Sequence, residues 1–380
     1  MNPRAFAQRR RALLLSTVAM AAAPTLVRAA AVTKPAGRPL VVAQLFDSSA
    51  AQQDVAKDFL VGSRAFWQDV NARGGVRGRP VSHLNLEVDG TLAGLRAALA
   101  QVRDDPSCVV VSGTAGAALA AETVGQLRLM GLGIAHAAPW LQNSSDEVDE
   151  RTFPIFAARQ EQIAHALRSL TVVGIRDVGA VYATAADHRL YRDDLERAAA
   201  GLGLRLQSYG ADGELERMGQ RLTPGTPAVL LFIGGTPELV QFTQGLERQQ
   251  RQRYVIALAD VNLQTVQQMG GARSTPVIAA QAVPMVTSSL PVVRAYRHTL
   301  ARLFDEPPAA LSLAGYIAAR YTFEVLQDID GPVTRQSALL AFQRRGGLDV
   351  GGFRVSFDAR RRSASFVTQS MLTQDGRVVG

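Results

Sequence analysis

Apolar runs of strand length alternate with helix-spaced apolar positions along most of the chain. The expected strands cover residues 39–46, 81–89, 108–113, 132–138, 177–184, 204–210, 228–235 and 254–260. The expected helices between them cover residues 52–71, 95–102, 117–131, 163–174, 190–203 and 237–249. Continuous apolar strands separated by amphipathic helices predict parallel sheets with helices on both faces. Because this series occurs twice, we expect an α/β fold with two doubly wound lobes.

The first expected helix has apolar residues at helical spacing. They are separated by four, three, four and four positions and lie at Val55, Phe59, Gly62, Phe66 and Val70. The helix runs into VNARGGVRGRP, residues 70–80, whose glycines suggest a phosphate-binding loop. Such a loop follows a strand and precedes a helix, whereas this segment has the reverse order. We therefore expect Gly74 or Gly75 to end the helix in a left-handed conformation, and Gly78 to turn the chain toward a strand beginning near Pro80.

The last third of the chain departs from this alternation. Helices are expected over residues 291–304, 311–329 and 337–344. Strands at residues 353–358 and 364–373 follow, with a turn at 374–376. The two halves of the chain share no short sequence repeat, so their likeness is architectural.

Residues 1–31 have the composition of an export signal. Arginines near the start are followed by an Ala-rich apolar run and then by small residues suited to cleavage near residues 29–31. The pair Arg10-Arg11 fits a twin-arginine signal, and a general secretory signal with a basic start explains the same residues. The apolar run is short for a membrane anchor, and no cysteine near the cleavage region supports a lipid anchor. We therefore expect an exported protein.

Removing this signal changes the charge of the chain. Residues 1–31 hold five arginines and no acid, so their loss lowers the formal net charge from +8 to +3 and leaves 349 residues. No later stretch gathers Lys and Arg with interleaved aromatic residues, so nucleic acid is not an expected partner. The run Arg360-Arg361-Arg362 is expected to be a solvated turn. The remaining length predicts two domains of about 150–200 residues each.

The sequence contains none of the motifs that mark common enzymes. It lacks a G-x-S-x-G elbow, an H-E-x-x-H helix, a paired C-x-x-C and a P-loop, and its five histidines lack metal-ligand spacing. His136 ends an expected strand and fits either a structural histidine or one facing a cleft. The single cysteine, Cys108, excludes an internal disulfide and opens an apolar run, which indicates a small buried side chain. We expect no catalysis, cofactor or metal.

Ligands of open parallel sheets bind beyond the carboxyl ends of the strands, where loops lead into helix N-termini. Four such junctions occur at residues 113–117, 137–140, 234–238 and 260–262. Thr236 is expected to cap a helix whose first position is Pro237, and Asp260 or Asn262 to cap the next helix. Each junction alone also fits an ordinary turn. Together they predict the edge along which a cleft lies.

The order of these elements resembles that of a known family. The segments that carry the resemblance are LVVAQLF, a helix ending in DVNARGGVRGRPV, a strand ending in LEVD, CVVVSGTAGAALAAE, MGLGIAHAA, VYATAADHRLYRDDL and ALADVN. Together they resemble the periplasmic solute-binding proteins of branched-chain amino acid ABC transporters, the leucine/isoleucine/valine-binding type of type I periplasmic binding proteins. The resemblance covers essentially the whole chain after the signal.

For the fold, the resemblance implies two Rossmann-like lobes with parallel sheets, joined by a three-crossover hinge. Lobe I would comprise residues 32–154 and 286–357, and lobe II residues 155–285 and 358–380. The crossovers would lie near residues 153–157, 282–286 and 357–361. Solute would bind between the lobes, which would close by a hinge motion.

In lobe I, the resemblance points to two ligand loops that depart from the family pattern. The loop after the third strand usually presents a hydroxyl to the ligand carboxylate, but Ala117 stands near that place, with Thr114 as the nearest substitute. The following loop usually offers a threonine, and here Pro139 and Trp140 occupy it. These departures indicate a less usual solute than leucine, such as an aromatic or other small organic acid.

In lobe II, the resemblance points to three side chains. Tyr191 matches the family's tyrosine, and Thr236 lies near a position that often holds an aromatic contact. Asp260 stands at, or one place from, the acid that binds the ligand's ammonium group. A closed pocket of such hydrogen-bonding groups is what makes recognition selective.

The resemblance thus predicts the solute-binding component of an ABC importer, working as a monomer with an inner-membrane permease. Backbone N–H groups would hold a polar or carboxylate end of the solute at Gly116, Ala117, Ala137 and Ala138. Three aromatic side chains would pack against its apolar body, those of Phe46, Trp140 and Tyr191. Two alternatives remain, a periplasmic sensor that feeds a regulatory partner and an exported α/β enzyme.

Overall fold

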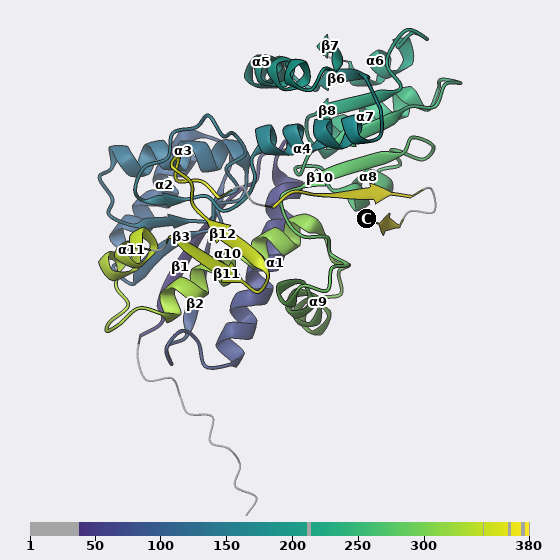
Figure 1. Cartoon of the computed structure of the whole chain (residues 1–380). Helices are drawn as coiled ribbons and strands as arrows, with labels where there is room; N and C mark the ends of the chain where they lie inside the picture. The colour runs from purple at the N-terminus through teal and green to yellow at the C-terminus, as the bar shows by residue number, and fades with distance from the viewer. Residues whose placement is uncertain (1–37, 211–213, 345, 364–365, 374–376, 380) are drawn as a thin grey trace, which may run out of the picture. The chain divides into compact units, whose positions relative to one another are not determined.

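The computed structural model describes residues 38–210, 214–344, 346–363, 366–373 and 377–379 (Figure 1). The export signal expected at residues 1–31 and the turn expected at 374–376 lie outside these ranges. Within them, the strands form a five-stranded sheet, a seven-stranded sheet and a two-stranded hairpin.

The five-stranded sheet is parallel. Its strands follow the order β2 (Val81–Val88), β1 (Leu40–Asp47), β3 (Cys108–Ser112), β4 (Ala135–Ala137) and β5 (Thr152–Phe153). Along the chain, β1, β2 and β3 are each followed by a helix. These helices are, in the same order, α1 (Gln53–Ala72), α2 (Leu92–Asp104) and α3 (Ala117–Leu129). In β1, Leu40 and Val42 join the core that contains α1, whereas Val41, Ala43 and Leu45 join the core that contains α2 and α3. Both faces are buried, and this explains the continuous apolar run.

The seven-stranded sheet is built in the same way. Its strands follow the order β14 (Val378–Val379), β13 (Thr368–Leu372), β10 (Val277–Gln281), β9 (Tyr254–Ala257), β8 (Val229–Ile233), β6 (Asp177–Tyr182) and β7 (Arg205–Gly210). Its helices are α4 (Arg159–Val172), α5 (Ala185–Gly201), α6 (Leu215–Arg221), α7 (Thr236–Leu246) and α8 (Leu263–Gln268). Strand β13 pairs antiparallel with both β10 and β14, and the remaining pairs are parallel. Helices α4 and α5 pack on one face, and α6, α7 and α8 on the other.

The chain returns to the first sheet after β10. Three helices and a hairpin pack there, α9 (Pro291–Leu303), α10 (Ala310–Gln327), α11 (Arg335–Arg344), and β11 (Gly347–Val350) with β12 (Phe353–Ser356). We call the first sheet with these elements lobe I and the second sheet with its helices lobe II. Three links join them, after β5, β10 and β12. The Ser363 N–H donates to the Pro154 carbonyl at 3.1 Å, and the Thr368 hydroxyl to the Val283 carbonyl at 2.7 Å, so the links are adjacent. The exact lobe boundaries remain predictions.

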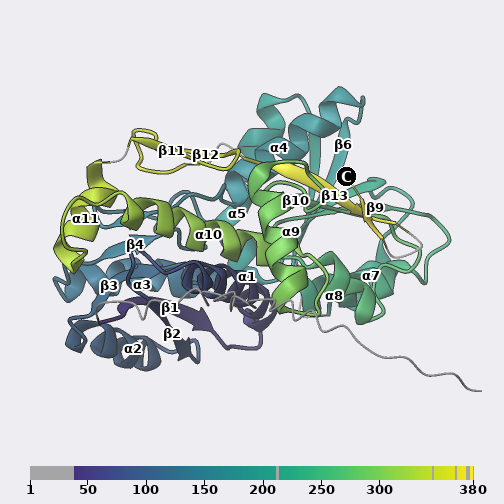
Figure 2. The ribbon, with the colours of Figure 1, turned by 90° about the horizontal axis from the view of Figure 1, so that it is seen from below.

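Helices α1 and α10 approach each other closely in the lobe I core (Figure 2). A Cβ atom on Gly62 would lie 1.7 Å from the Ser312 carbonyl oxygen, and one on Gly315 would lie 1.8 Å from the Phe59 carbonyl oxygen. Only glycine permits this spacing, because each Cβ would overlap a backbone atom of the other helix. The rest of the predicted stripe of α1 is also buried, so the helical periodicity is confirmed.

The segment after α1 behaves as its glycines predict. Gly74, Gly75 and Gly78 have φ angles of 103°, 78° and 77°, and β2 begins one residue after Pro80. The arginine run at residues 360–362 differs from expectation at its last position. Arg362 is buried and donates to the carbonyls of the loop at residues 143–146, so it is not a solvated side chain.

Several elements differ from the sequence prediction, since α6, β5 and β11 were not predicted and two other strands differ more clearly. Strand β10 was not predicted, although it pairs with both β9 and β13. Strand β4 is only three residues long, whereas the apolar pattern predicted a longer strand over residues 132–138. An apolar pattern indicates which residues are buried. For a short segment it does not distinguish a strand from another buried conformation.

Candidate functional site

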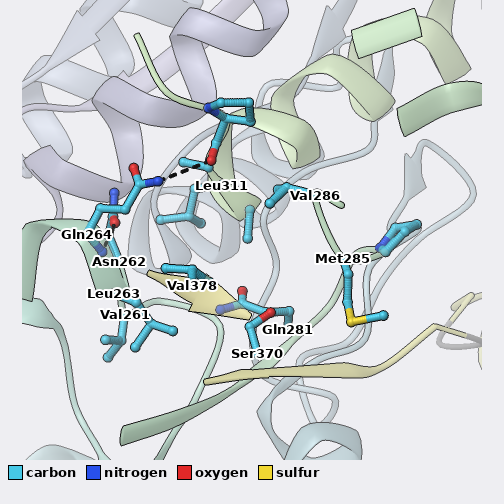
Figure 3. A pocket seen from close by; sticks show the side chains of 14 residues that line it. Val261, Asn262, Leu263, Gln264, Gln281, Met285, Val286, Leu311, Ser370 and Val378 are labelled. Atoms are coloured by element: carbon cyan, nitrogen blue, oxygen red, sulfur yellow. Dashed lines mark hydrogen bonds between the residues drawn. The ribbon is translucent and has the colours of Figure 1, made fainter. Parts of the chain in front are cut away.

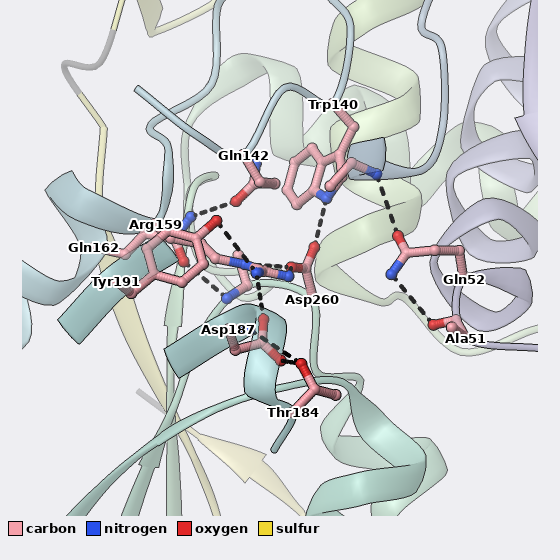
Figure 4. Close-up of polar contacts among 12 residues, drawn as sticks. Ala51, Gln52, Trp140, Gln142, Arg159, Gln162, Thr184, Asp187, Tyr191 and Asp260 are labelled. Atoms are coloured by element: carbon pink, nitrogen blue, oxygen red, sulfur yellow. Dashed lines mark hydrogen bonds and ion pairs between the residues drawn. The ribbon is translucent and has the colours of Figure 1, made fainter. Parts of the chain in front are cut away.

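Loops from the two sheets meet at a buried hydrogen bond. Trp140 lies in the loop after β4 in lobe I, and Asp260 lies in the loop after β9 in lobe II. The indole Nε1 of Trp140 donates to Oδ1 of Asp260 at 2.7 Å (Figure 4). Each residue is only 1% exposed. The contact therefore joins the carboxyl ends of the two sheets, the edge at which α/β proteins bind ligands.

The other oxygen of Asp260 is bound by an arginine. Arg159 is the first residue of α4, directly after the first link between the lobes. Its Nε and Nη2 atoms lie 2.9 and 2.5 Å from Oδ2 of Asp260. Its Nη1 atom lies 3.3 Å from both Oδ1 of Asp187 and the hydroxyl of Tyr191, and its guanidinium carbon lies 5.2 Å from the centre of the Tyr191 ring.

The electrostatics of this group follow from burial and pairing. Burial alone would lower the pKa of the Arg159 guanidinium, but the carboxylates of Asp260 and Asp187 together with Tyr191 outweigh it and raise the pKa above its ordinary value. Burial is also the main cause that raises the pKa of the Tyr191 hydroxyl. The guanidinium is therefore a permanent cation between two acids.

Asp187 is held by the N-terminus of α5. Thr184 caps this helix, with its hydroxyl oxygen accepting from the Asp187 N–H at 3.0 Å and lying 2.7 Å from Oδ2 of the same residue. A carboxylate in the first turn is stabilised by the helix dipole. The helix end thus positions the second acid beside Arg159.

A chain of two glutamines runs next to this network. The Nε2 atom of Gln162 donates to the carbonyl of Ala157 and to Oε1 of Gln142, both at 2.8 Å. Its Oε1 atom accepts from the backbone N–H of Ala259 at 2.9 Å. The backbone N–H of Arg159 donates to the Gln142 carbonyl at 3.0 Å. The loop that carries Trp140 and Gln142 is therefore bonded to lobe II at three places.

Aromatic rings surround the lobe I side of the network. The Trp140 ring lies with its centroid 5.8 Å from that of Phe59 and 5.3 Å from that of Phe156. A second contact between the lobes lies nearby, where the Asn262 side-chain amide donates to Oδ2 of Asp58 on α1. Burial raises the pKa of Asp58 to about 6, against a lowering by the bond from Asn262.

The predicted lobe II residues have mixed outcomes. Tyr191 and Asp260 come together with Trp140 in the network described above. Thr236 does not cap its helix, because α7 begins at Thr236 itself and Gly235 occupies the capping position. Its hydroxyl instead accepts from the backbone N–H of Asn262, which does cap α8 as predicted. Asp260 does not cap that helix, because its carboxylate is bound by Arg159 and Trp140.

The predicted lobe I hydroxyl is already bonded. Thr114 is fully buried, and its Oγ1 atom lies 2.8 Å from Nε2 of His136. Burial lowers the pKa of His136 to about 3, so the ring is neutral. His136 is thus a buried partner of Thr114. Cys108 is likewise buried as predicted, and burial raises the pKa of its thiol to about 11.

Two of the four predicted backbone donors of lobe I have partners within the chain. The Ala117 N–H donates to Oε1 of Gln52 at 3.2 Å, and the Ala138 N–H donates to the Phe153 carbonyl at 3.0 Å. Ala138 is therefore engaged with β5 and is not free to hold a solute in this conformation. Ala137 ends β4. At Ala117, the backbone N–H that was predicted to bind a solute oxygen is bound to Oε1 of Gln52.

Two predicted residues lie at the edge of the lobe I core. Gly116 has a φ angle of 117°, and a Cβ atom there would lie 2.7 Å from Cβ of Asp47. Its glycine is therefore required by the turn into α3. Phe46 is partly buried and forms a bridge with Ala115.

The sequence analysis missed several members of the network, namely Gln142, Arg159, Gln162 and Asp187. Arg159 and Gln162 lie in the first turn of an amphipathic helix, where a polar residue ordinarily faces solvent. Their partners lie in other elements, so no spacing along the chain marks them. One local signal was present, the Thr184-to-Asp187 spacing that begins α5.

A separate narrow pocket lies beside the second link (Figure 3). Its polar lining includes Asn262, Gln264, Gln281 and Ser370, and its apolar lining includes Met285 and Leu311. The cavity volume is about 30 Å³, or about 450 Å³ with the space open to solvent at its mouth. The enclosed part has room for about two water molecules and is too small for an amino-acid-sized solute.

The model of the periplasmic binding protein family matches residues 39–374 of the chain. The chain belongs to this family. A comparison with curated protein sequences yields no match.

Solved structures support the fold of this family member. An extracellular ligand-binding receptor from Verminephrobacter eiseniae has a TM-score of 0.81 at 17% identity, over 90% of this chain and 100% of that one. A fatty acid ABC transporter substrate-binding protein from Thermomonospora curvata has a TM-score of 0.76 at 13% identity, over 89% and 90%. The branched-chain amino acid transporter substrate-binding protein LivJ from Streptococcus pneumoniae, in complex with isoleucine, has a TM-score of 0.72 at 12% identity, over 90% and 98%. These are binding proteins, not enzymes.

The described ranges contain neither a candidate membrane span nor a candidate metal site. No helix among those residues is both long and apolar enough to cross a membrane. The same residues contain no group of three or more His, Cys, Asp or Glu side chains placed to hold a metal ion.

Proposed function

We propose that this family member is the periplasmic solute-binding component of an ABC importer. It captures a small polar or carboxylate-bearing solute, amino-acid-like or an organic acid, between its two lobes and delivers it to a permease. The solute is held where Trp140, Arg159, Tyr191 and Asp260 meet.

The observation that carries this proposal is the contact between Trp140 and Asp260. These residues come from the carboxyl ends of strands in different sheets and lie 2.7 Å apart through Nε1 and Oδ1. A polar group that touches both loops is therefore bound by both lobes at once. A ligand with different contacts in the open and closed states shifts the equilibrium between them, which is how such proteins signal occupancy to a permease.

Two further observations support export and transport. Residues 1–31 have the basic, apolar and small-residue order of an export signal. The comparable solved structures include substrate-binding proteins of ABC transporters, one of them bound to isoleucine. We expect the chain from about residue 32 onward to act in the periplasm as a monomer.

A thermal-shift screen of amino acids and small organic acids on the chain lacking residues 1–31 tests this function. A solute present at about 100 times its Kd adds about 2.7 kcal/mol to the free energy of unfolding and raises the melting temperature. Hits are then measured by calorimetry on the Tyr191→Ala variant, which is expected to bind at least about tenfold more weakly. Unchanged binding by this variant would contradict the proposed site. A screen without any stabilising solute would contradict the transport function.

A further inference from the structure

We propose that the solute of this site carries a hydrogen-bond-accepting head group and no ammonium group. This inference rests on the solute-binding function proposed above and narrows the class of solute. It follows from which polar atoms of the network are already paired and which are not.

The acid that the resemblance assigned to an ammonium group is occupied by the chain itself. Oδ1 of Asp260 accepts from Trp140 at 2.7 Å, and Oδ2 accepts from two nitrogen atoms of Arg159 at 2.9 and 2.5 Å. Asp260 is 1% exposed, and the Arg159 side chain is 11% exposed. An ammonium group would have to displace a buried guanidinium that binds through two N–H groups, whereas an ammonium is a compact point charge without that fork geometry.

The second acid of the network, Asp187, also has partners for both of its carboxylate oxygens. Oδ1 of Asp187 lies 3.3 Å from Nη1 of Arg159, and its Oδ2 lies 2.7 Å from the hydroxyl of Thr184. The N-terminus of α5 provides further positive potential at this carboxylate. Both carboxylates of the network are thus paired without a solute.

Unpaired donors remain, and the first is the amide of Gln142. The orientation of Gln162 is determined by the backbone, since its Nε2 donates to the Ala157 carbonyl and its Oε1 accepts from the Ala259 N–H. Gln162 therefore donates to Gln142 through Nε2, so the atom of Gln142 that accepts this bond must be its amide oxygen Oε1. The Nε2 atom of Gln142 then points away from Gln162, and it is buried with no hydrogen-bond partner.

The second donor is the hydroxyl of Tyr191. Its oxygen accepts from Nη1 of Arg159, so its proton points elsewhere, and the hydroxyl donates to no acceptor among the described residues. Gln142 and Tyr191 both contact Arg159, the former through its backbone carbonyl, and Figure 4 draws all three on one side of the Trp140–Asp260 contact. A site with paired acceptors and unpaired donors fits the oxygen of a carbonyl or a carboxylate.

The apolar part of the site indicates the body attached to this head group. The ring of Trp140 packs against Phe59 and Phe156. A phenyl or branched alkyl group would pack against these rings. The probes below share such bodies and differ only in the head group.

The test is calorimetric titration of the chain lacking residues 1–31 with matched series of solutes. One series is phenylalanine, 3-phenylpropanoate and 3-phenylpropanamide, and the other is leucine, 4-methylpentanoate and 4-methylpentanamide. The compounds without an ammonium group are expected to bind at least about tenfold more tightly than the amino acids. The difference between acid and amide then identifies whether the accepted oxygen is charged. Tighter binding of phenylalanine or leucine would overturn the inference.

Two variants test the donors directly. Gln142→Glu replaces the unpaired amide with an acceptor of the same shape, and it is expected to weaken binding of the acid and amide probes by at least about tenfold. Tyr191→Phe removes only the hydroxyl and is expected to weaken binding in the same direction. Gln126→Glu is the matched control, because Gln126 lies on α3 outside the site and accepts from Arg96. If Gln142→Glu and Gln126→Glu bind the probes equally, the donor assignment is wrong.

The two proposals fail in different ways. A chain that binds only ammonium-bearing solutes in the wider screen keeps its transport function and overturns the head-group inference. A chain that binds no solute in either series or in the wider screen overturns both. A hit outside these series supports the inference if it has an acceptor head group without ammonium.

Discussion

The indole Nε1 of Trp140 donates to Oδ1 of Asp260, and the bond is the point at which loops of the two lobes meet in a buried environment. Hydrogen bonds to a charged acceptor contribute about 1.5–3 kcal/mol. The bond therefore contributes both to the stability of the chain and to the equilibrium between open and closed lobes.

Trp140→Phe should remove this bond while keeping an aromatic side chain. We expect the free energy of unfolding to fall by about 2–4 kcal/mol, because a buried acceptor loses its donor and the smaller ring leaves a cavity. Trp67→Phe is the control, since Trp67 is equally buried in the lobe I core and packs against Phe66. Urea unfolding of both variants measures the difference. If the two losses are equal, the hydrogen bond contributes nothing beyond packing.

Arg159→Met should leave Asp260 as an uncompensated buried charge. We expect a loss of about 3–5 kcal/mol in the free energy of unfolding. The double variant Arg159→Met/Asp260→Leu should lose less than the sum of its single variants, because neither charge then remains unpaired. Arg205→Met breaks the exposed pair with Asp177 and should leave stability unchanged within error. Additive losses in the double variant would show that the two side chains act independently.

Asp58→Asn should change the pH dependence of stability. Because burial raises the folded pKa of Asp58 to about 6 from an ordinary 3.8, its protonated form stabilises the fold below about pH 4. That contribution is lost as the pH rises through 6, up to about 3 kcal/mol for a shift of about two pKa units. The amide of the variant cannot ionise, so the variant should become the more stable protein between about pH 4 and pH 7. Parallel stability curves for the two proteins, measured by urea unfolding, would contradict this pKa.

Gly315→Ala should disrupt the close approach of α1 and α10. The added Cβ would lie 1.8 Å from the Phe59 carbonyl oxygen, so the helices must separate. We expect a loss of about 3 kcal/mol or more in the free energy of unfolding, since backbone atoms of a packed core cannot move cheaply. Gly125→Ala on α3 meets no atom within 4 Å and should instead stabilise the chain by about 0.5–1 kcal/mol. Thermal unfolding of the two variants distinguishes these effects.

The sequence predicted the α/β architecture because burial on both faces of a parallel sheet leaves continuous apolar runs in β1, β3 and β8. The same reasoning predicted α1, whose apolar stripe is buried at every position. It did not predict β10, a five-residue strand that pairs with β9 and β13. A short segment of this kind becomes a strand through its hydrogen bonds to neighbouring strands, which are distant in the sequence.

The candidate site was only partly predictable. Trp140, Tyr191 and Asp260 were identified because loops at the carboxyl ends of parallel strands share one edge of a sheet, and because the order of elements resembles a family. Arg159 was not, because a polar residue in the first turn of a helix has no local feature that separates a buried ion pair from a solvated one. Thr114 was expected to face a solute, and its bond to His136 became visible only in three dimensions.

The sequence by itself determined most of the elements and their order, because these depend on periodicity and on short-range turn chemistry. The edge of the sheets at which a ligand would bind stays a prediction. Only the tertiary structure showed that Asp260 and Asp187 are both already paired within the chain. That outcome depends on Arg159 of α4 reaching Asp260, which lies 101 positions farther along the chain. Distances of this kind are set by the packing of two lobes, and no pattern within one segment of sequence contains them.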